Sequence, residues 1–167
     1  MHVKKLTLIG RRLLKIDPDY AHNLLVEIEQ NSKPALRNDF DRIPEILDIF
    51  CSEMNIESSY IQGDLLKTGE VRRKMECRKL FVLVILMIYD PIMITEFKHE
   101  RLRMKLREHI RKVLGIKSSQ TVSVMIYDAL NLYSIKKGAY KDFSTKADLI
   151  YNLVKQGIMN DDINIAS

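Results

Sequence analysis

The chain has 167 residues, of which 46% are hydrophobic and 29% are charged, a composition that supports a buried core and excludes an intrinsically disordered protein. Its 27 Lys and Arg residues against 22 Asp and Glu residues give a net charge of +5, which permits a polyanionic partner without requiring one. Two cysteines, Cys51 and Cys77, cannot build a secreted disulfide framework and lie in no zinc-binding pattern, so we expect no metal, no cofactor and a cytoplasmic location.

Residues 1–38 are expected to form an N-terminal helical arm. The first 17 residues are basic but lack the long apolar core and the cleavage site of a signal peptide. Asp17 and Pro18 favour a helix start, because Asp can cap free amides and Pro is tolerated in a first turn. The apolar stripe that follows ends near Asn31, and we expect the arm to offer a surface to a protein partner.

Residues 39–157 are expected to form the main domain, an all-α helical bundle. Its central helix is predicted at about 75–89, because the sequence is apolar nearly all round after Lys79. That apolar run is about half as long as a membrane span and ends at Pro91, so we expect no membrane contact. Apolar spacings of three and four predict the other helices at about 39–54, 95–114, 119–133 and 144–155. The last segment, 158–167, is expected to be a frayed tail.

Positive charge is concentrated in two stretches of the main domain. Residues 67–79 carry a net charge of +4 and residues 98–117 a net charge of +6, while the whole chain carries +5. Neutralisation of nucleic-acid phosphates requires such segregated charge, because each phosphate contact releases condensed counterions. Charge alone leaves a second interpretation open, in which these Lys and Arg side chains are the solvated faces of helices.

Residues 106–124 have the pattern of a helix-turn-helix. An apolar-patterned helix ends at Gly115, which permits a tight reversal, and a second helix follows a short polar turn. The side chains expected to lock the two helices together are Ile110, Leu114, Ile116 and Val124. In the first turn of the second helix, Ser119, Gln120 and Ser123 would reach base edges in a major groove. Any corner between two helices can show the same pattern, so the motif alone does not decide the function.

The wider arrangement resembles the C-terminal DNA-binding domain, domain IV, of the bacterial replication initiator DnaA, a helical domain of the Trp-repressor-like type. That family has a basic loop, a helix opening with an Arg-Gln pair, and a helix-turn-helix with a pattern like I-G-x-x-F-G-G-R-D-H-T-T-V. The resemblance covers about 48–154 and implies a Trp-repressor-like fold. In this sequence the matching positions are 67–74 for the loop, Arg78-Lys79 for the pair, and Ile110, Leu114-Gly115 and Thr121-Val122 for the motif.

The resemblance also implies which residues contact DNA. Arg72 would be the minor-groove arginine of the basic loop, and 117–122 would be the base-reading segment. Together with the helix-turn-helix pattern, the expected DNA contacts are Arg72, Arg73, Lys74, Arg78, Lys117, Ser118, Ser119, Gln120, Thr121 and Ser123. The sequence departs from the family in three ways: Lys-Ser-Ser-Gln-Thr replaces the R-D-H-T-T core, Arg111 replaces a small residue, and 89–105 is an extra segment. The family's own DNA site is therefore not implied.

No set of residues has the spacing of a catalytic site. The four histidines are scattered, and none of the six glycines belongs to a GxxxxGK[ST] nucleotide-binding motif, so we expect no enzyme and no initiator ATPase. The first hypothesis is a double-stranded DNA-binding protein that serves replication or transcription in a phage or mobile element. The alternative is a helical structural or protein-interaction protein, such as an assembly component or anti-initiator, whose basic face meets an acidic protein. The DNA sequence bound and the oligomeric state stay open.

Overall fold

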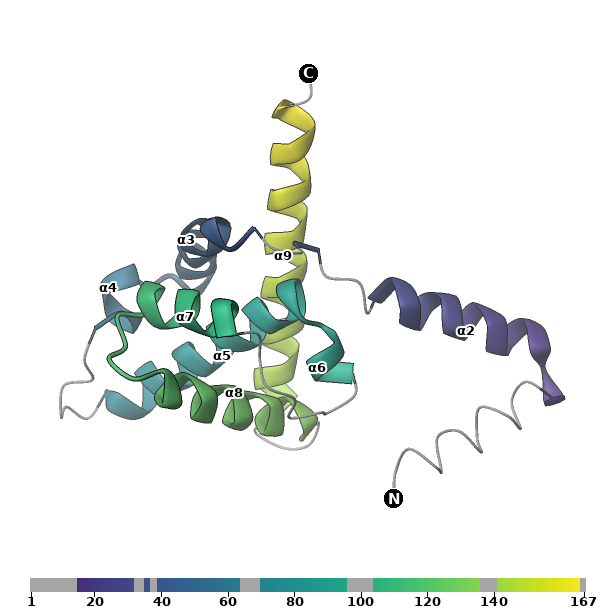
Figure 1. The fold of residues 1–167 in the computed structure, drawn as a ribbon, viewed down its shortest axis with the longest axis horizontal. Helices are drawn as coiled ribbons and strands as arrows, with labels where there is room; N and C mark the ends of the chain where they lie inside the picture. The colour runs from purple at the N-terminus through teal and green to yellow at the C-terminus, as the bar shows by residue number, and fades with distance from the viewer. Residues whose placement is uncertain are drawn as a thin grey trace. The chain divides into compact units, whose positions relative to one another are not determined.

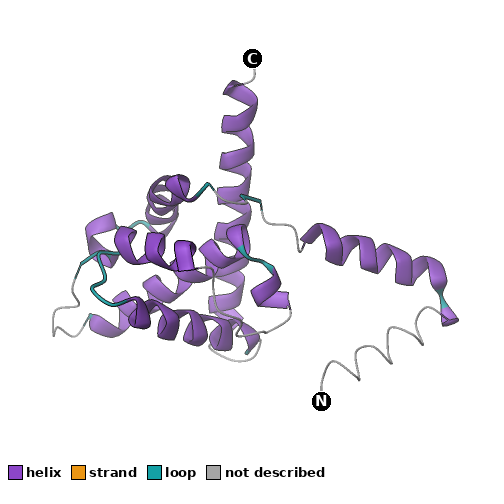
Figure 2. Cartoon of the chain, in the orientation of Figure 1, coloured by secondary structure: helices purple, strands orange, loops and turns teal. Residues whose placement is uncertain are grey.

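A computed structural model gives the fold of the chain. Every regular element in the part it describes is a helix, which confirms the predicted all-α helical bundle (Figure 2). The expected basic-loop residues 67–69 and residues 96–103 of the extra segment lie outside that part. The described residues are 15–31, 35–36, 39–63, 70–95, 104–135 and 141–165.

The chain divides into two compact units, Met1–Lys33 and Pro34–Ser167. The division falls five residues before the boundary expected at residue 38. In the first unit, helix α2 spans Pro18–Asn31, as predicted. Asp17 stabilises its start, because an Asp17 side-chain oxygen accepts a hydrogen bond of 2.9 Å from the backbone N–H of Tyr20.

The second unit is built around helix α5, Val71–Tyr89 (Figure 1). Every side chain from Leu80 to Tyr89 is buried, which confirms the central position predicted for this segment. Other helices cover α5, and the burial of this whole run explains why its sequence is apolar all round. Helices α8 (Ser119–Ser134) and α9 (Lys141–Ile165) pack against it most, and α4 (Ser58–Ile61) and α3 (Ile43–Met54) also contact it.

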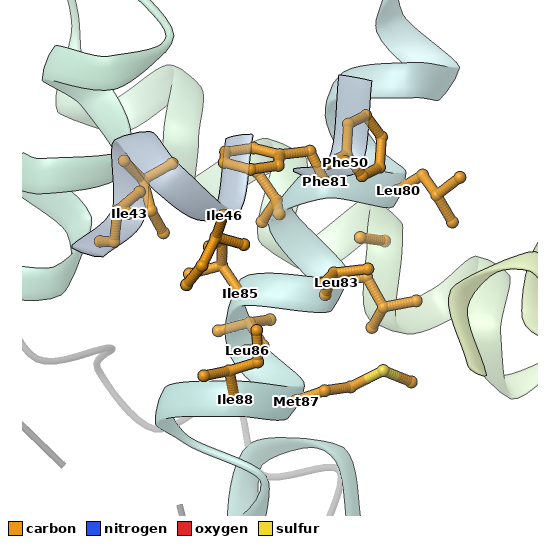
Figure 3. Close-up of a cluster of buried hydrophobic side chains, with 14 of the residues drawn as sticks. Ile43, Ile46, Phe50, Leu80, Phe81, Leu83, Ile85, Leu86, Met87 and Ile88 are labelled. Atoms are coloured by element: carbon orange, nitrogen blue, oxygen red, sulfur yellow. The ribbon is translucent and has the colours of Figure 1, made fainter. Parts of the chain in front are cut away.

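Side chains of α3 and α5 meet in a cluster of buried hydrophobic residues (Figure 3). Phe50 of α3 and Phe81 of α5 meet edge to face, with ring centroids 5.3 Å apart. At the end of α5 the buried Tyr89 hydroxyl donates a 2.7 Å hydrogen bond to the backbone carbonyl of Asp39. Burial raises the pKa of Tyr89 above its ordinary value. The phenol therefore stays neutral and keeps donating at physiological pH.

Two helices are longer than the apolar pattern predicted. Helix α5 begins at Val71 rather than 75, in a polar turn supported by an ion pair of 3.3 Å between Arg72 and Glu76, four residues apart. Helix α9 continues to Ile165, beyond the expected domain end at 157. Backbone hydrogen bonds continue a helix through residues that carry no apolar signal, so the pattern underestimated both lengths.

The remaining elements complete the second unit on either side of α5. A 3-10 turn, η1 (Phe40–Arg42), leads into α3, which begins at Ile43, next to the latest start, Arg42, that Pro44 in the first turns of the predicted helix allows. The short helix α6 (Ile92–Thr95) follows α5. Helix α7 (Met104–Val113) packs on α3, η1 and α8, and the Phe40 ring lies 5.3 Å from that of His109.

Candidate nucleic-acid interface

Helices α7 and α8 meet at a corner, residues 114–118, which Figure 1 shows as a short connection between the two. Gly115 adopts a left-handed conformation with φ of +64°. Its N–H bonds to the carbonyl of Lys112 at 3.1 Å, and the N–H of Ile116 bonds to that of Arg111 at 2.9 Å. This pair of hydrogen bonds is the Schellman arrangement that commonly ends a helix. The predicted end of the helix at Gly115 is confirmed, and its cause is the left-handed backbone of Gly115 together with these two hydrogen bonds.

Gln62 and Gly63, which follow α4, donate hydrogen bonds to the same corner. The N–H of Gly63 donates to the carbonyl of Leu114 at 2.9 Å, and the side-chain amide of Gln62 donates to that of Val113, also at 2.9 Å. A Cβ atom at Gly115 would lie only 3.0 Å from the backbone nitrogen of Gly63. Gly115 is thus required twice, for its backbone angle and for the close approach of another segment.

Arg78 anchors this outer segment to the core. Its side chain is only 3% exposed, and Nε donates a 2.6 Å hydrogen bond to the carbonyl of Ile61. The guanidinium also donates to the carbonyl of Gly63. The expectation that Arg78 contacts DNA is therefore corrected, because its charged group is buried against backbone carbonyls that need a donor.

Arg111 explains one departure from the DnaA pattern. Its Nε lies 2.8 Å from a carboxylate oxygen of Glu108, and its Nη1 donates to the carbonyl of Ile116 at 3.2 Å. The hydrogen bond from Arg111 is the main reason that the pKa of Glu108 lies below its usual value. A long cationic side chain at this position therefore braces the corner from α7 where the family has a small residue.

The first turn of α8 combines structural and exposed polar groups. Ser118 is the N-cap, and its hydroxyl accepts a hydrogen bond of 3.2 Å from the N–H of Gln120. The half-buried Ser123 hydroxyl donates to the carbonyl of Ser119 at 3.3 Å and accepts from Arg107 at 3.4 Å. Among the expected contacts here, the exposed side chains are Lys117, Ser118, Gln120 and Thr121.

The outer face of α8 includes two residues that the sequence analysis did not assign to it. Val124 is 55% exposed and Tyr127 is 51% exposed, four and seven residues after Gln120 on the same helix face. Val124 was expected to lock the corner, and that expectation is wrong, because Val124 is exposed, whereas Val122 is fully buried. The i, i+4, i+7 spacing from Gln120 was the signal available in the sequence.

The remaining expected contacts lie at the start of α5, in a helix and not in a loop. Arg72 and Arg73 are exposed, and Lys74 Nζ lies 5.0 Å from the centre of the Tyr60 ring. Arg72 and Arg73 border a cavity of about 610 Å³, here called the α5–α9 hollow. Residues of α9 and Leu132, near the C-terminal end of α8, border it as well. No residue from 117 to 123 borders this hollow. The structure thus brings Lys117, Gln120 and Thr121 together, with Arg72 and Arg73 at a separate feature.

Neither a metal-binding cluster nor a thiol with a lowered pKa is found among the described residues. No three His, Cys, Asp or Glu side chains in the described ranges converge to hold a metal ion. Both cysteines are buried, and burial raises the pKa of Cys51 to about 11 and that of Cys77 above its ordinary value. Both thiols are therefore protonated at neutral pH and poorly suited to act as nucleophiles.

Among the helices described, none is long and apolar enough to cross a bilayer. No family model, curated protein or solved structure matches this chain. Function must therefore be argued from the corner, the outer face of α8 and the distribution of charge.

Proposed function

We propose that the protein binds double-stranded DNA through its α7–α8 corner, with α8 in the major groove, and catalyses no reaction. The observation that carries the proposal is the exposed polar turn of Lys117, Gln120 and Thr121 on a corner that Gly63, Arg78 and Arg111 hold from behind. A fixed helix terminus with exposed donors and acceptors suits the reading of base edges.

The electrostatics of the corner support the proposal. The α7–α8 segment, 104–135, has five Lys or Arg residues and two acidic ones, a net charge of +3. Both acids are engaged by cations: Glu108 by Arg111 at 2.8 Å, and Asp128 by Lys79 at 2.7 Å. Repulsion between phosphates and these carboxylates is reduced as a result, while the exposed Lys105, Lys112 and Lys117 favour a polyanion.

The outer face of α8 supplies a second kind of contact. Val124 is one turn beyond Gln120, where an exposed branched side chain suits contact with the methyl group of thymine. Tyr127 lies farther along the same face, and its hydroxyl suits a phosphate oxygen. The proposal therefore assigns base reading to Gln120, Thr121 and Val124, with Ser118, Ser119 and Ser123 shaping the turn that presents them.

Arg72, Arg73 and Lys74 are proposed to neutralise phosphates that flank the groove contact. Arg72 and Arg73 are exposed, which such a role requires, and they lie at the start of a helix. The likeness to domain IV of DnaA supports a role in replication or transcription, and a phage or mobile element is the proposed setting. The absence of a nucleotide-binding motif in the sequence fits a DNA-binding module without its own motor.

Selection of bound duplexes from a random pool, using the full chain, tests this proposal. We expect an enriched motif, and an affinity for it that falls with salt at a log–log slope of about −4 to −5 if four to six phosphates are neutralised. The double variant Gln120→Ala/Thr121→Ala should lose the preference for the motif, with Asn152→Ala on the exposed side of α9 as the matched control. No enrichment together with a flat salt response rejects DNA binding and favours a protein partner for the same face.

A further inference from the structure

The α5–α9 hollow combines an apolar wall with a charged rim. On this rim the cations of Arg72, Arg73, Lys79 and Lys146 outnumber the carboxylates of Glu76 and Asp142. It is open to solvent, and its volume of about 610 Å³ lies within the range of small-molecule sites. Four of its apolar residues pack against the core but keep part of their surface uncovered. The apolar wall consists of Met54, Ile56, Met75, Leu80, Leu132 and Phe143.

The shape of this wall suits a flexible apolar ligand. Met54 and Met75 are unbranched and adapt to the outline of a bound group, while Phe143 offers a flat surface. Covering these side chains removes apolar area from water, at about 25 cal/mol for each Å² buried. An apolar chain or ring of a small molecule is therefore favoured over water in the hollow.

Two cations from different helices border the hollow. Arg73 of α5, Lys146 of α9 and the buried Cys77 all border it, and the two cations each lower the pKa of the Cys77 thiol, which burial raises. Within the described residues neither cation is in an ion pair, whereas Arg72 is paired with Glu76 and Lys79 with Asp128. Arg73 and Lys146 thus form a positively charged position beside the apolar wall.

We propose that the α5–α9 hollow binds a small anionic amphiphile, a single carboxylate joined to an apolar chain or ring. The carboxylate lies between Arg73 and Lys146, where it accepts charge-assisted hydrogen bonds, and the apolar part covers Met75, Leu132 and Phe143. This site is separate from the outer face of α8, although Arg73 is also one of the proposed phosphate contacts, and it is tested in the absence of DNA.

Calorimetric titration of the full chain with decanoate, below its micelle concentration, tests the site directly and without DNA. Decanoate should bind at one site per chain, while acetate, which lacks the apolar part, and decyltrimethylammonium, which reverses the charge, should not. If decanoate fails to bind, or decyltrimethylammonium binds equally well, the proposal is overturned.

Three variants locate the binding. Arg73→Gln/Lys146→Gln should weaken decanoate binding about tenfold, because each exposed charge contributes modestly, whereas Lys155→Gln removes the same charge from α9 outside the hollow and should change nothing. Leu132→Trp should abolish binding by filling the hollow, with circular dichroism confirming that the chain still folds. Unchanged affinity in the double Gln variant overturns the proposal, and duplex binding by Lys146→Gln at the wild-type level keeps this outcome distinct from that of the DNA proposal.

Discussion

The buried guanidinium of Arg78 donates to the backbone carbonyl of Gly63, fifteen residues earlier in the chain. Gly63 in turn donates its N–H to Leu114, at the end of α7. Arg78 thereby connects the central helix to the α7–α8 corner through a segment with no regular structure of its own.

Replacing Arg78 by Ala should destabilise the fold by about 2–4 kcal/mol. The change leaves the carbonyls of Ile61 and Gly63 without a donor and opens a cavity beside the corner. Urea unfolding measures the loss, with Arg73→Ala on the exposed side of the same helix as the control, expected within about 0.5 kcal/mol of wild type. Equal stability of the two variants would show that the buried hydrogen bonds contribute nothing net.

The corner glycine and a glycine within α9 should respond oppositely to the same substitution. Gly115→Ala should cost about 1–3 kcal/mol, because its φ is +64° and the new Cβ would meet the Gly63 nitrogen at 3.0 Å. Gly157→Ala should be neutral or stabilise by up to about 1 kcal/mol, because its Cβ would make an ordinary 3.6 Å contact with Ile49. Denaturant midpoints of the two variants measure both changes in stability. A Gly115→Ala protein as stable as wild type would contradict the close approach of the Gly63 nitrogen to Gly115.

Sequence patterning was most informative where one physical effect dominates. The run from Leu80 to Tyr89 is apolar on all sides, and only a central position buries every face of such a helix. Gly115 marked the end of α7 because few other residues adopt its backbone angle. Both features are local, so the sequence was sufficient to predict them.

The errors arose where partners are distant in the chain. Arg78 stands next to Lys79 and after three other cations, so its sequence context is typical of a surface, and the carbonyls that bury it belong to 61–63. Val122 and Val124 are two residues apart and cannot share one helix face, but the sequence does not show which of them meets α7. Long-range packing determines both the burial of Arg78 and the choice between the two valines. The periodicity of the sequence carries no information about that packing.

The two valines of α8 therefore give a sharp test of the interface. Val124→Glu places a carboxylate on the exposed outer face, where we expect duplex affinity to fall at least about tenfold with little change in stability. Val122→Ala removes two buried methyl groups and should cost about 1–3 kcal/mol of stability, with the DNA preference of the folded protein retained. Fluorescence anisotropy with the selected duplex and urea unfolding separate the effects; full affinity in Val124→Glu would remove α8 from the interface.

Stability should fall in alkaline solution through Cys51. Burial, followed by the nearby Asp48 carboxylate and Cys77, raises the pKa of the Cys51 thiol from 9.0 to about 11 in the folded chain. The folded state therefore holds a proton that the unfolded state releases first, so the stabilisation is complete below pH 9 and is lost as pH rises from about 9 to 11. The loss approaches about 1.4 kcal/mol per pH unit within that window.

The Cys51 effect is isolated by comparing wild type with Cys51→Ala. Tyr89 and Tyr133 also have raised pKa values and add to alkaline unfolding in both proteins, so only the difference between the two reports on Cys51. Urea unfolding at pH 8, 9.5 and 11 should show the two stabilities converging, because the variant lacks the titrating thiol. A constant difference across this range would mean that the Cys51 thiol ionises as readily in the folded chain as in the unfolded one.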